Sequence, residues 1–203
     1  MSLKLEIKRK ALHMTGLSVP LVYLLFGKEI ALIFVTTFLV IFILLEPFRI
    51  VEDLRNKVKK KLGLPNGVVE RLEKEIDSIT REHEKRNIGA HIYFTIAALL
   101  IVFFFPKEVA IGSIAVATLG DAMAAIIGKP FGRHRFKNGK SIEGSLAYFL
   151  TGLAILTPLI GIKMAVLGSL VGTLAELYEL PPDDNFSNQL AIAIALYLAG
   201  VRG

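Results

Sequence analysis

An acidic residue that interrupts an apolar segment is the first candidate for chemistry in this chain. Asp121 lies in the run Leu119–Ala125, whose other members are small or apolar. A carboxylate inside a membrane segment is costly and usually serves a function. We therefore expect Asp121 to bind a metal ion or to act as a catalytic base, with small neighbours that let a ligand approach closely. A structural ion pair between Asp121 and a Lys or Arg is the alternative.

A basic, glycine-rich segment follows Asp121. Residues Gly128–Ser141 contain five Lys or Arg and three Gly. Glycines let backbone N–H groups converge on an anion, and the cations neutralise it. Ser141–Ser145 then begins a predicted helix, whose free N–H groups and positive dipole end would add to anion binding. The pattern predicts a phosphate-binding loop, and an ordinary positively charged cytoplasmic loop is the alternative.

Further acidic residues lie at the ends of later apolar segments. Glu176 ends one of them, and Asp183-Asp184-Asn185 opens the last. Hard oxygen ligands on the same side as a phosphate loop favour Mg²⁺, which typically bridges carboxylates and substrate phosphates. We predict a metal site formed by Asp121, Glu176, Asp184 and Asn185. Helix N-capping is the alternative for the acidic triplet, and it explains one of the three residues well.

The elements that must position these residues are apolar blocks separated by charged connections. Each block is somewhat shorter than the roughly 20 residues that a membrane helix needs, so flanking residues or tilt must supply the remaining length. We predict a single all-α domain over residues 1–203, a polytopic bundle of about seven transmembrane helices. The blocks are Ala11–Phe26, Ile30–Leu45, Ile88–Phe105, Val109–Gly120, Leu146–Ile160, Met164–Ala175 and Phe186–Val201.

The distribution of positive charge predicts the orientation of the bundle. Lys and Arg gather before the first block and in residues 46–87 and 129–140, whereas the other connections carry one or none and the C-terminus carries one. The positive-inside rule places the three rich segments in the cytoplasm. The net charge of +6 therefore indicates membrane topology rather than a nucleic-acid partner. We expect an integral protein of the cell membrane with its active site at the cytoplasmic face.

Composition excludes one kind of chemistry, and periodicity predicts a further pair of helices. The chain has no cysteine, which excludes disulfides and thiolate chemistry. Within residues 46–87, apolar residues recur at helical spacing on both sides of a Gly/Pro break. We predict two amphipathic helices that lie on the membrane or pack beneath the bundle. A solvated hairpin that merely connects two transmembrane helices is the alternative.

Taken in order, the motifs of the chain resemble those of the CTP-dependent polyprenol kinases, the family of dolichol kinase, phytol kinase and related isoprenoid-alcohol kinases. The chain is short, and in this it resembles a compact prokaryotic or archaeal member of that family. The motifs are Arg9-Lys10-x-x-His13-x-x-x-Gly16, Glu46-x-x-Arg49, Gly120-Asp121-x-x-Ala124, Gly128-x-x-x-Gly132, Gly139-Lys140-Ser141-x-Glu143-Gly144-Ser145, and Glu176 followed by Asp184-Asn185.

The resemblance implies transfer of the γ-phosphate of CTP to the hydroxyl of a dolichol, phytol or geranylgeraniol type of alcohol, with Mg²⁺. It implies that the isoprenoid tail lies between helices while the hydroxyl meets the nucleotide. The implied catalytic residues are Asp121, His13 and Lys140. The implied nucleotide-binding residues are Lys129, Gly132, Arg133, Gly139, Lys140, Ser141, Glu143, Gly144 and Ser145.

Two other functions fit the same pattern. A cytidylyltransferase that makes a CDP-lipid from CTP and a lipid phosphate has a similar basic, glycine-rich loop. A transporter or lipid-binding membrane protein without catalysis would use the buried acids and cytoplasmic cations to bind an anionic solute. His13, taken alone, is more often a packed, hydrogen-bonded histidine than a catalyst.

Overall fold

A computed structural model of the protein describes residues 9–50, 61 and 88–202. These residues are helical apart from short connections, and within them no strand occurs beyond a single β-bridge between Arg135 and Ser141. The all-α prediction is therefore confirmed for this part of the chain. The amphipathic helices predicted for residues 46–87 lie outside it, except for positions 46–50 and 61.

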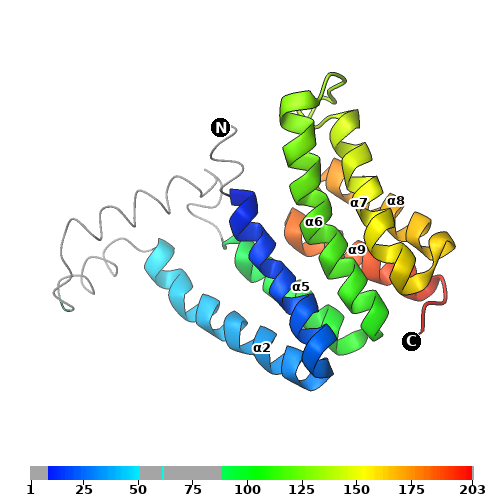
Figure 1. Cartoon of the computed structure of the whole chain (residues 1–203). Helices are drawn as coiled ribbons and strands as arrows, with labels where there is room; N and C mark the ends of the chain where they lie inside the picture. Colours follow the sequence, from blue (N-terminus) through cyan, green and yellow to red (C-terminus); the bar gives the residue numbers. More distant parts are fainter. Residues whose placement is uncertain (1–8, 51–60, 62–87, 203) are drawn as a thin grey trace.

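The helices follow the apolar blocks of the sequence (Figure 1). Residues 9–13 are helical and lead into η1. Gly27 divides α2 into two halves, because its φ of 84° belongs to the left-handed region that glycine adopts without a steric penalty. The elements are η1 (Met14–Leu17), α2 (Ser18–Ile50), α5 (Ala90–Phe104), α6 (Lys107–Phe131), α7 (Ile142–Ile160), α8 (Ile162–Tyr178) and α9 (Asp184–Leu198).

Three of these helical stretches are long and apolar enough to cross a membrane: Arg9–Pro47, Lys107–Phe131 and Ile142–Ile160. Helix α5 is apolar but shorter. Length and composition therefore support a helical membrane protein, whereas the count of about seven spans is not confirmed. The outer face of α2 carries exposed apolar side chains, among them Leu25 at 69% and Leu44 at 64%. Such a continuous apolar surface fits contact with lipid.

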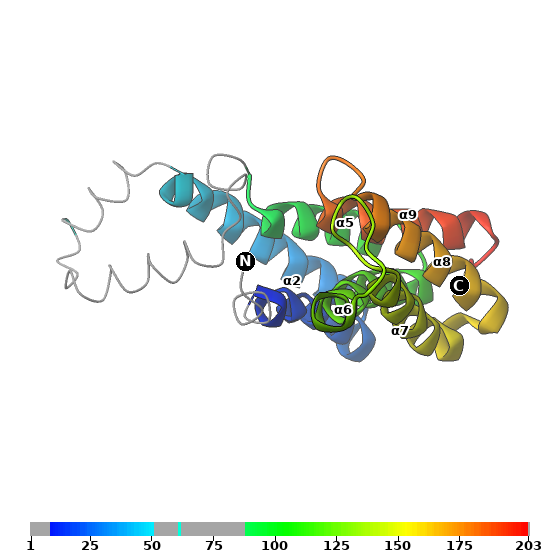
Figure 2. The same ribbon diagram turned by 90° about the horizontal axis from the view of Figure 1, so that it is seen from above.

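Helix α6 lies between the start of the chain and α7 and packs against every other described helix (Figure 2). It packs against α7, α9 and the first half of α2, and its residues from Val109 to Thr118 are all buried. The halves of α2 diverge from Gly27, so that the second half leaves α6 and packs against α5 instead (Figure 1). Residues 9–26, which we call the N-terminal helix, are thus separated by a space from the second half of α2.

Tyr148 holds four helices together from its place on α7. It is fully buried, and its hydroxyl donates a 2.8 Å hydrogen bond to Oδ1 of Asn188 on α9. Its ring fits against Gly120 of α6 and Gly172 of α8, where an added Cβ would come within 2.8 and 2.9 Å of Tyr148. Small residues thus let α6 and α8 approach the tyrosine closely.

Tyr148→Phe is expected to lower the free energy of unfolding in detergent by about 1–3 kcal/mol, because Oδ1 of buried Asn188 loses its donor. Thermal unfolding followed by circular dichroism measures the change. Tyr197→Phe is the matched control, since Tyr197 is 41% exposed. Equal unfolding midpoints for the two variants would contradict the role given to Tyr148.

Candidate functional site

Asp121 faces the N-terminal helix and forms an ion pair there. Nζ of Lys10 donates a hydrogen bond to Oδ2 of Asp121, and Nε2 of His13 lies 3.6 Å from the same oxygen. Lys10 is only 4% exposed, and a buried ammonium requires such a partner. The structural alternative foreseen for Asp121 is therefore present. In the sequence, Lys10 counts among the basic residues before the first apolar block and belongs to the motif Arg9-Lys10-x-x-His13, but neither feature names it as the partner of Asp121.

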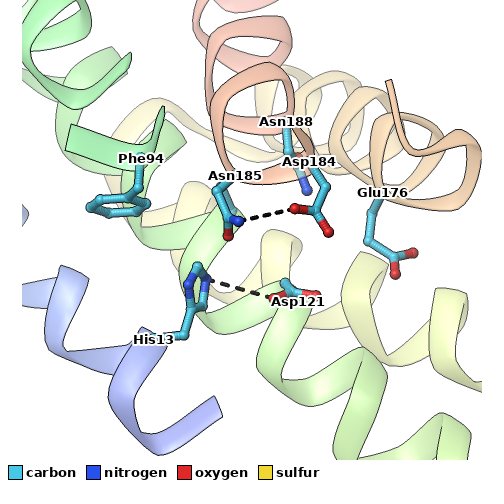
Figure 3. Close-up of a pocket in the computed structure, with 8 residues that line it drawn as sticks. His13, Phe94, Asp121, Glu176, Asp184, Asn185 and Asn188 are labelled. Atoms are coloured by element: carbon cyan, nitrogen blue, oxygen red, sulfur yellow. Dashed lines mark hydrogen bonds and ion pairs between the residues drawn. The ribbon is translucent and has the colours of Figure 1, made fainter. Parts of the chain in front are cut away.

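Asp121 also borders a small cavity, which we call the acidic cavity (Figure 3). Figure 3 shows the side chains of Asp121, Glu176 and Asp184 around this space, contributed by α6, α8 and α9. All four residues predicted as metal ligands line it. Its lining consists of His13, Phe94, Ala117, Asp121, Glu176, Asp184, Asn185 and Asn188.

Among the residues that the structure describes, the acidic cavity does not form a complete metal site by itself. Within residues 9–50, 61 and 88–202, no three His, Cys, Asp or Glu side chains are grouped closely enough to hold a metal ion. Magnesium is usually bound by one or two carboxylates together with substrate phosphates. The carboxylates of Asp121, Glu176 and Asp184 supply such oxygens.

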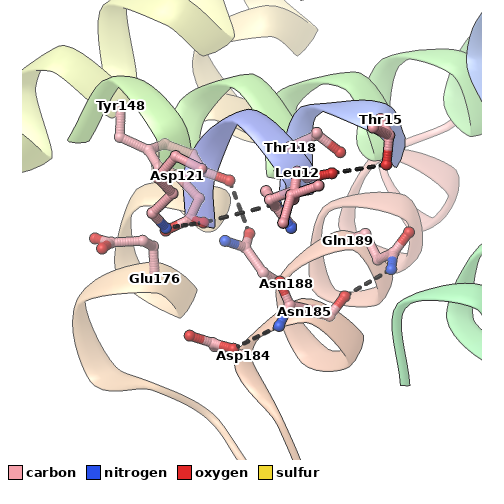
Figure 4. Close-up of polar contacts among 12 residues, drawn as sticks. Leu12, Thr15, Thr118, Asp121, Tyr148, Glu176, Asp184, Asn185, Asn188 and Gln189 are labelled. Carbon is pink, nitrogen blue, oxygen red and sulfur yellow. Dashed lines mark hydrogen bonds and ion pairs between the residues drawn. The ribbon is translucent and has the colours of Figure 1, made fainter. Parts of the chain in front are cut away.

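At the start of α9, one residue caps the helix and the next two line the acidic cavity. Asp183 is the N-cap, and its Oδ1 accepts a 2.9 Å hydrogen bond from N–H of Asn185. Asp184 and Asn185 line the acidic cavity, and Nδ2 of Asn185 donates to Oδ1 of Asp184 at 2.9 Å (Figure 4). Helix N-capping therefore explains one residue of the triplet, Asp183, and does not explain Asp184 and Asn185.

A second pocket of about 290 Å³ adjoins the acidic cavity and shares Asp121, Glu176 and Asp184 with it. We call it the basic pocket, because Lys, Arg and backbone of the glycine-rich segment form much of its wall. Six of the nine predicted nucleotide-binding residues line it: Lys129, Gly139, Lys140, Ser141, Gly144 and Ser145. Arg9, Lys10, Arg135 and Asn138 join them.

Three of the predicted nucleotide-binding residues do not line the basic pocket. Gly132 fits beneath Ser141, where an added Cβ would lie 2.6 Å from the serine side chain. Glu143 pairs with His134, at 3.0 Å between Oε1 and Nδ1, and thus orients the loop. Arg133 is exposed. Charge and spacing alone could not separate these residues from those that face the pocket.

The loop itself begins later than predicted, because α6 continues to Phe131. Residues Ala122–Ile127 favour helix, and a proline as late as position 130 does not break it. Gly128 and Lys129 therefore belong to the last helical turn rather than to the loop. Asp121 consequently lies well inside α6, not next to its end.

Arg135 stabilises the conformation of the loop. Its guanidinium donates hydrogen bonds to the carbonyl oxygens of Gly139, Gly128 and Lys129 at 3.0–3.2 Å. Gly139 allows the tight turn with a φ of +85°. Sequence reasoning missed Arg135, since a residue that binds carbonyls looks the same in sequence as one that binds phosphate.

Lys140 joins the loop to α8. Its Nζ donates to the backbone carbonyl of Glu176 and lies 2.9 Å from the carboxylate Oε1 of that residue. Asn138 reinforces the contact by donating to the carbonyl of Leu177 at 2.7 Å. Lys140 and Glu176, 36 positions apart in the sequence, are thus in direct contact.

The start of α7 differs from the expected array of free N–H groups. Ile142 donates its N–H to the carbonyl of His134, and Gly144 donates to Oγ of the N-cap Ser141. The N–H of Ser145 bonds to the carbonyl of Ser141. The expectation is therefore wrong for these three groups, because the contact with His134, the Ser141 cap and the first hydrogen bond of the helix already use them. The helix dipole and the Ser145 hydroxyl, whose oxygen is buried without a partner, remain for anion binding.

An apolar groove of about 550 Å³ lies on the other side of the acidic cavity. It occupies the space between the N-terminal helix, the second half of α2 and the start of α5, and it shares His13, Phe94 and Asn185 with the cavity. The resemblance implied a tail between helices without locating it. Phe34, Phe38 and Phe42, spaced by four, were the signal in the sequence.

Glu46 from the second resemblance motif lies near this groove. Its Oε1 accepts a 2.7 Å hydrogen bond from N–H of Gly89, and its Oε2 lies 3.5 Å from Nε2 of His91. The buried carboxylate thus joins the end of α2 to the start of α5. The side chain of Arg49, its partner in the motif, is outside the described part of the chain.

Comparison with known proteins identifies three kinds of lipid kinase as relatives. CTP-dependent diacylglycerol kinase 1 of Schizosaccharomyces pombe is 29% identical over 80 residues, 38% of this chain and 37% of that protein. Probable phytol kinase 1 of Oryza sativa is 29% identical over 146 residues, 61% and 46% of the two chains. Dolichol kinase sec59 of S. pombe is 37% identical over 84 residues, 37% and 17%.

The resemblance to lipid-alcohol kinases drawn from the motifs is therefore confirmed. No family model and no solved structure matches the chain. The chain spans less than half the length of each of these three kinases.

Proposed function

We propose that this relative of the lipid-alcohol kinases transfers the γ-phosphate of CTP to the hydroxyl of a membrane isoprenoid alcohol. One observation carries the proposal: a basic pocket and an apolar groove meet at a single acidic cavity. A reaction between a triphosphate and a lipid alcohol requires this arrangement, because one substrate is highly anionic and the other is almost entirely apolar.

In this proposal the basic pocket holds the triphosphate. Lys129, Lys140 and Arg9 supply positive charge, and the Ser145 hydroxyl supplies a hydrogen bond. Phosphoryl transfer depends mainly on positioning and charge neutralisation, which such groups provide. The choice of CTP rests on the relative whose name states CTP dependence.

The alcohol reaches the acidic cavity from the apolar groove. Its oxygen forms a bond to the γ-phosphorus, the bond from that phosphorus to the β–γ bridging oxygen breaks, and CDP leaves with the electron pair. Asp121 accepts the hydroxyl proton, while His13, 3.6 Å from the same carboxylate, holds the hydroxyl in place. Lys10 keeps the Asp121 carboxylate in position through their ion pair.

Magnesium, held by Asp121 and Asp184 with Glu176 and Asn185 beside them, would neutralise the charge of the phosphates. We place the reaction at the cytoplasmic face, because the basic pocket lies at the end of the bundle that carries Arg9 and the positive loop after α6.

A screen of lipid alcohols against the four nucleoside triphosphates tests the proposal. Purified protein in lipid nanodiscs is supplied with phytol, geranylgeraniol, a dolichol or diacylglycerol, and lipid phosphate is measured. We expect phosphate transfer to an isoprenoid alcohol, with CTP as the best donor. If no alcohol is phosphorylated by any donor while the protein moves an anionic solute into liposomes, the transporter alternative replaces the kinase.

A further inference from the structure

The apolar groove has the dimensions and lining of a site for a single hydrocarbon chain. Its volume of about 550 Å³ lies within the roughly 300–1,000 Å³ of small-molecule sites. Phe34, Phe38 and Phe42 form a row along one face of α2, with ring centroids 4.8 and 5.9 Å apart. Buried Val19 and Val35 complete the lining.

The groove has a polar group at the place where it meets the acidic cavity. His13 and Asn185 line both spaces, and Nε2 of His13 is buried without a hydrogen bond. A molecule with one polar end and a long apolar body would therefore direct its polar end towards Asp121. Because the groove shares His13, Phe94 and Asn185 with the acidic cavity, an occupant of the groove lies next to that centre.

Phe94 on α5 stands at this junction and lines both spaces. Its ring meets the His13 ring edge-on, with centroids 5.8 Å apart. Gly16 makes room for it, since an added Cβ there would lie 2.6 Å from Cζ of Phe94. Its backbone carbonyl accepts a 3.0 Å hydrogen bond from Nε2 of Gln189, which also bonds to the carbonyl of Asn185. Contacts with His13 and Gly16 thus position the ring, and the hydrogen bond from Gln189 fixes the backbone that carries it.

We propose that the groove binds the hydrocarbon tail of the acceptor alcohol and that Phe94 determines its specificity. In the groove, Phe94 leaves passage for one chain beside the hydroxyl and excludes a glycerol that carries two acyl chains. The proposal rests on the proposed function for the identity of the acceptor. The passage is narrow because the Phe94 ring packs directly against Gly16.

Photo-crosslinking tests this without requiring catalysis. A geranylgeraniol analogue with a diazirine in its tail is irradiated with the protein in nanodiscs, in the absence of nucleotide. We expect labelled peptides from residues 12–19 and 34–42, and loss of the label when unmodified geranylgeraniol is in excess. Labelling confined to exposed outer positions such as Leu146 and Leu150, or unaffected by competition, overturns the tail site.

Competition by dioleoylglycerol then tests Phe94. We expect dioleoylglycerol to leave crosslinking in the wild-type groove unchanged. In Phe94→Ala it should reduce the crosslinking, at a concentration at least about tenfold below the highest one tested on the wild type. Phe104→Ala, an exposed phenylalanine of the same helix, should behave as wild type. Equal competition in the wild type and Phe94→Ala overturns the specificity role. If the label is competed as expected but no alcohol is phosphorylated, the tail site stands and the proposed kinase activity fails.

Discussion

Asp121→Asn is expected to reduce turnover by about 10²–10³-fold, because the centre loses the charge that accepts the hydroxyl proton and binds the cation. The substitution keeps the size of the side chain but leaves Lys10 without its charge partner. Phosphate transfer from CTP to geranylgeraniol is the measurement, with folding checked by circular dichroism. Glu108→Gln, in the first turn of the same helix, is the control and should retain activity.

The double variant Lys10→Gln/Asp121→Asn separates catalysis from structure. It removes both charges of the ion pair and therefore the cost of an unpaired buried ammonium. If Asp121 serves catalysis, the double variant stays as inactive as Asp121→Asn. Recovery of turnover in the double variant would show that Asp121 is only the structural partner of Lys10.

Lys140→Gln is expected to lower kcat/KM for CTP by about tenfold to a hundredfold, the effect of losing one hydrogen bond between charged groups. Lys140 lines the basic pocket and joins the loop to Glu176. Steady-state kinetics with varied CTP measure the change, and the KM for the lipid alcohol should stay within about twofold, because the apolar groove does not contain Lys140.

Lys137→Gln is the matched control for this experiment. Lys137 belongs to the same loop and carries the same charge, yet it is exposed and does not line the basic pocket. It should leave kcat/KM close to the wild-type value. Equal losses in the two variants would mean that the loop acts through its overall charge, as an ordinary cytoplasmic loop would, and not through a built phosphate site.

The sequence predicted the helices and the gathering of acids well, because both follow from local rules. Apolar blocks bounded by charges or glycines became helices close to their expected limits. Asp121, Glu176 and Asp184 line one cavity, where the inner part of α6 meets the end of α8 and the start of α9. The end of α6 differs from the prediction because Gly128 and Pro130, which the glycine-rich pattern assigns to the loop, can both occupy a last helical turn.

Features that depend on contacts between residues far apart in the sequence could not be predicted in this way. The partner of Asp121 is Lys10, 111 positions away, and nothing in the local sequence selects it among the other cations. The apolar groove exists because the halves of α2 diverge at Gly27, and one glycine does not encode the angle. The capped N–H groups of α7 likewise follow from how the loop folds back at His134.

The position of the transferred phosphorus tests the central claim most directly. Purified protein is given geranylgeraniol, geranylgeranyl phosphate and CTP that carries a radioactive label on either its α- or its γ-phosphate. If the acidic cavity transfers the terminal phosphate to an alcohol, label enters the lipid from the γ position alone and CDP accumulates. Entry of the α label with release of pyrophosphate would contradict this and identify a cytidylyltransferase.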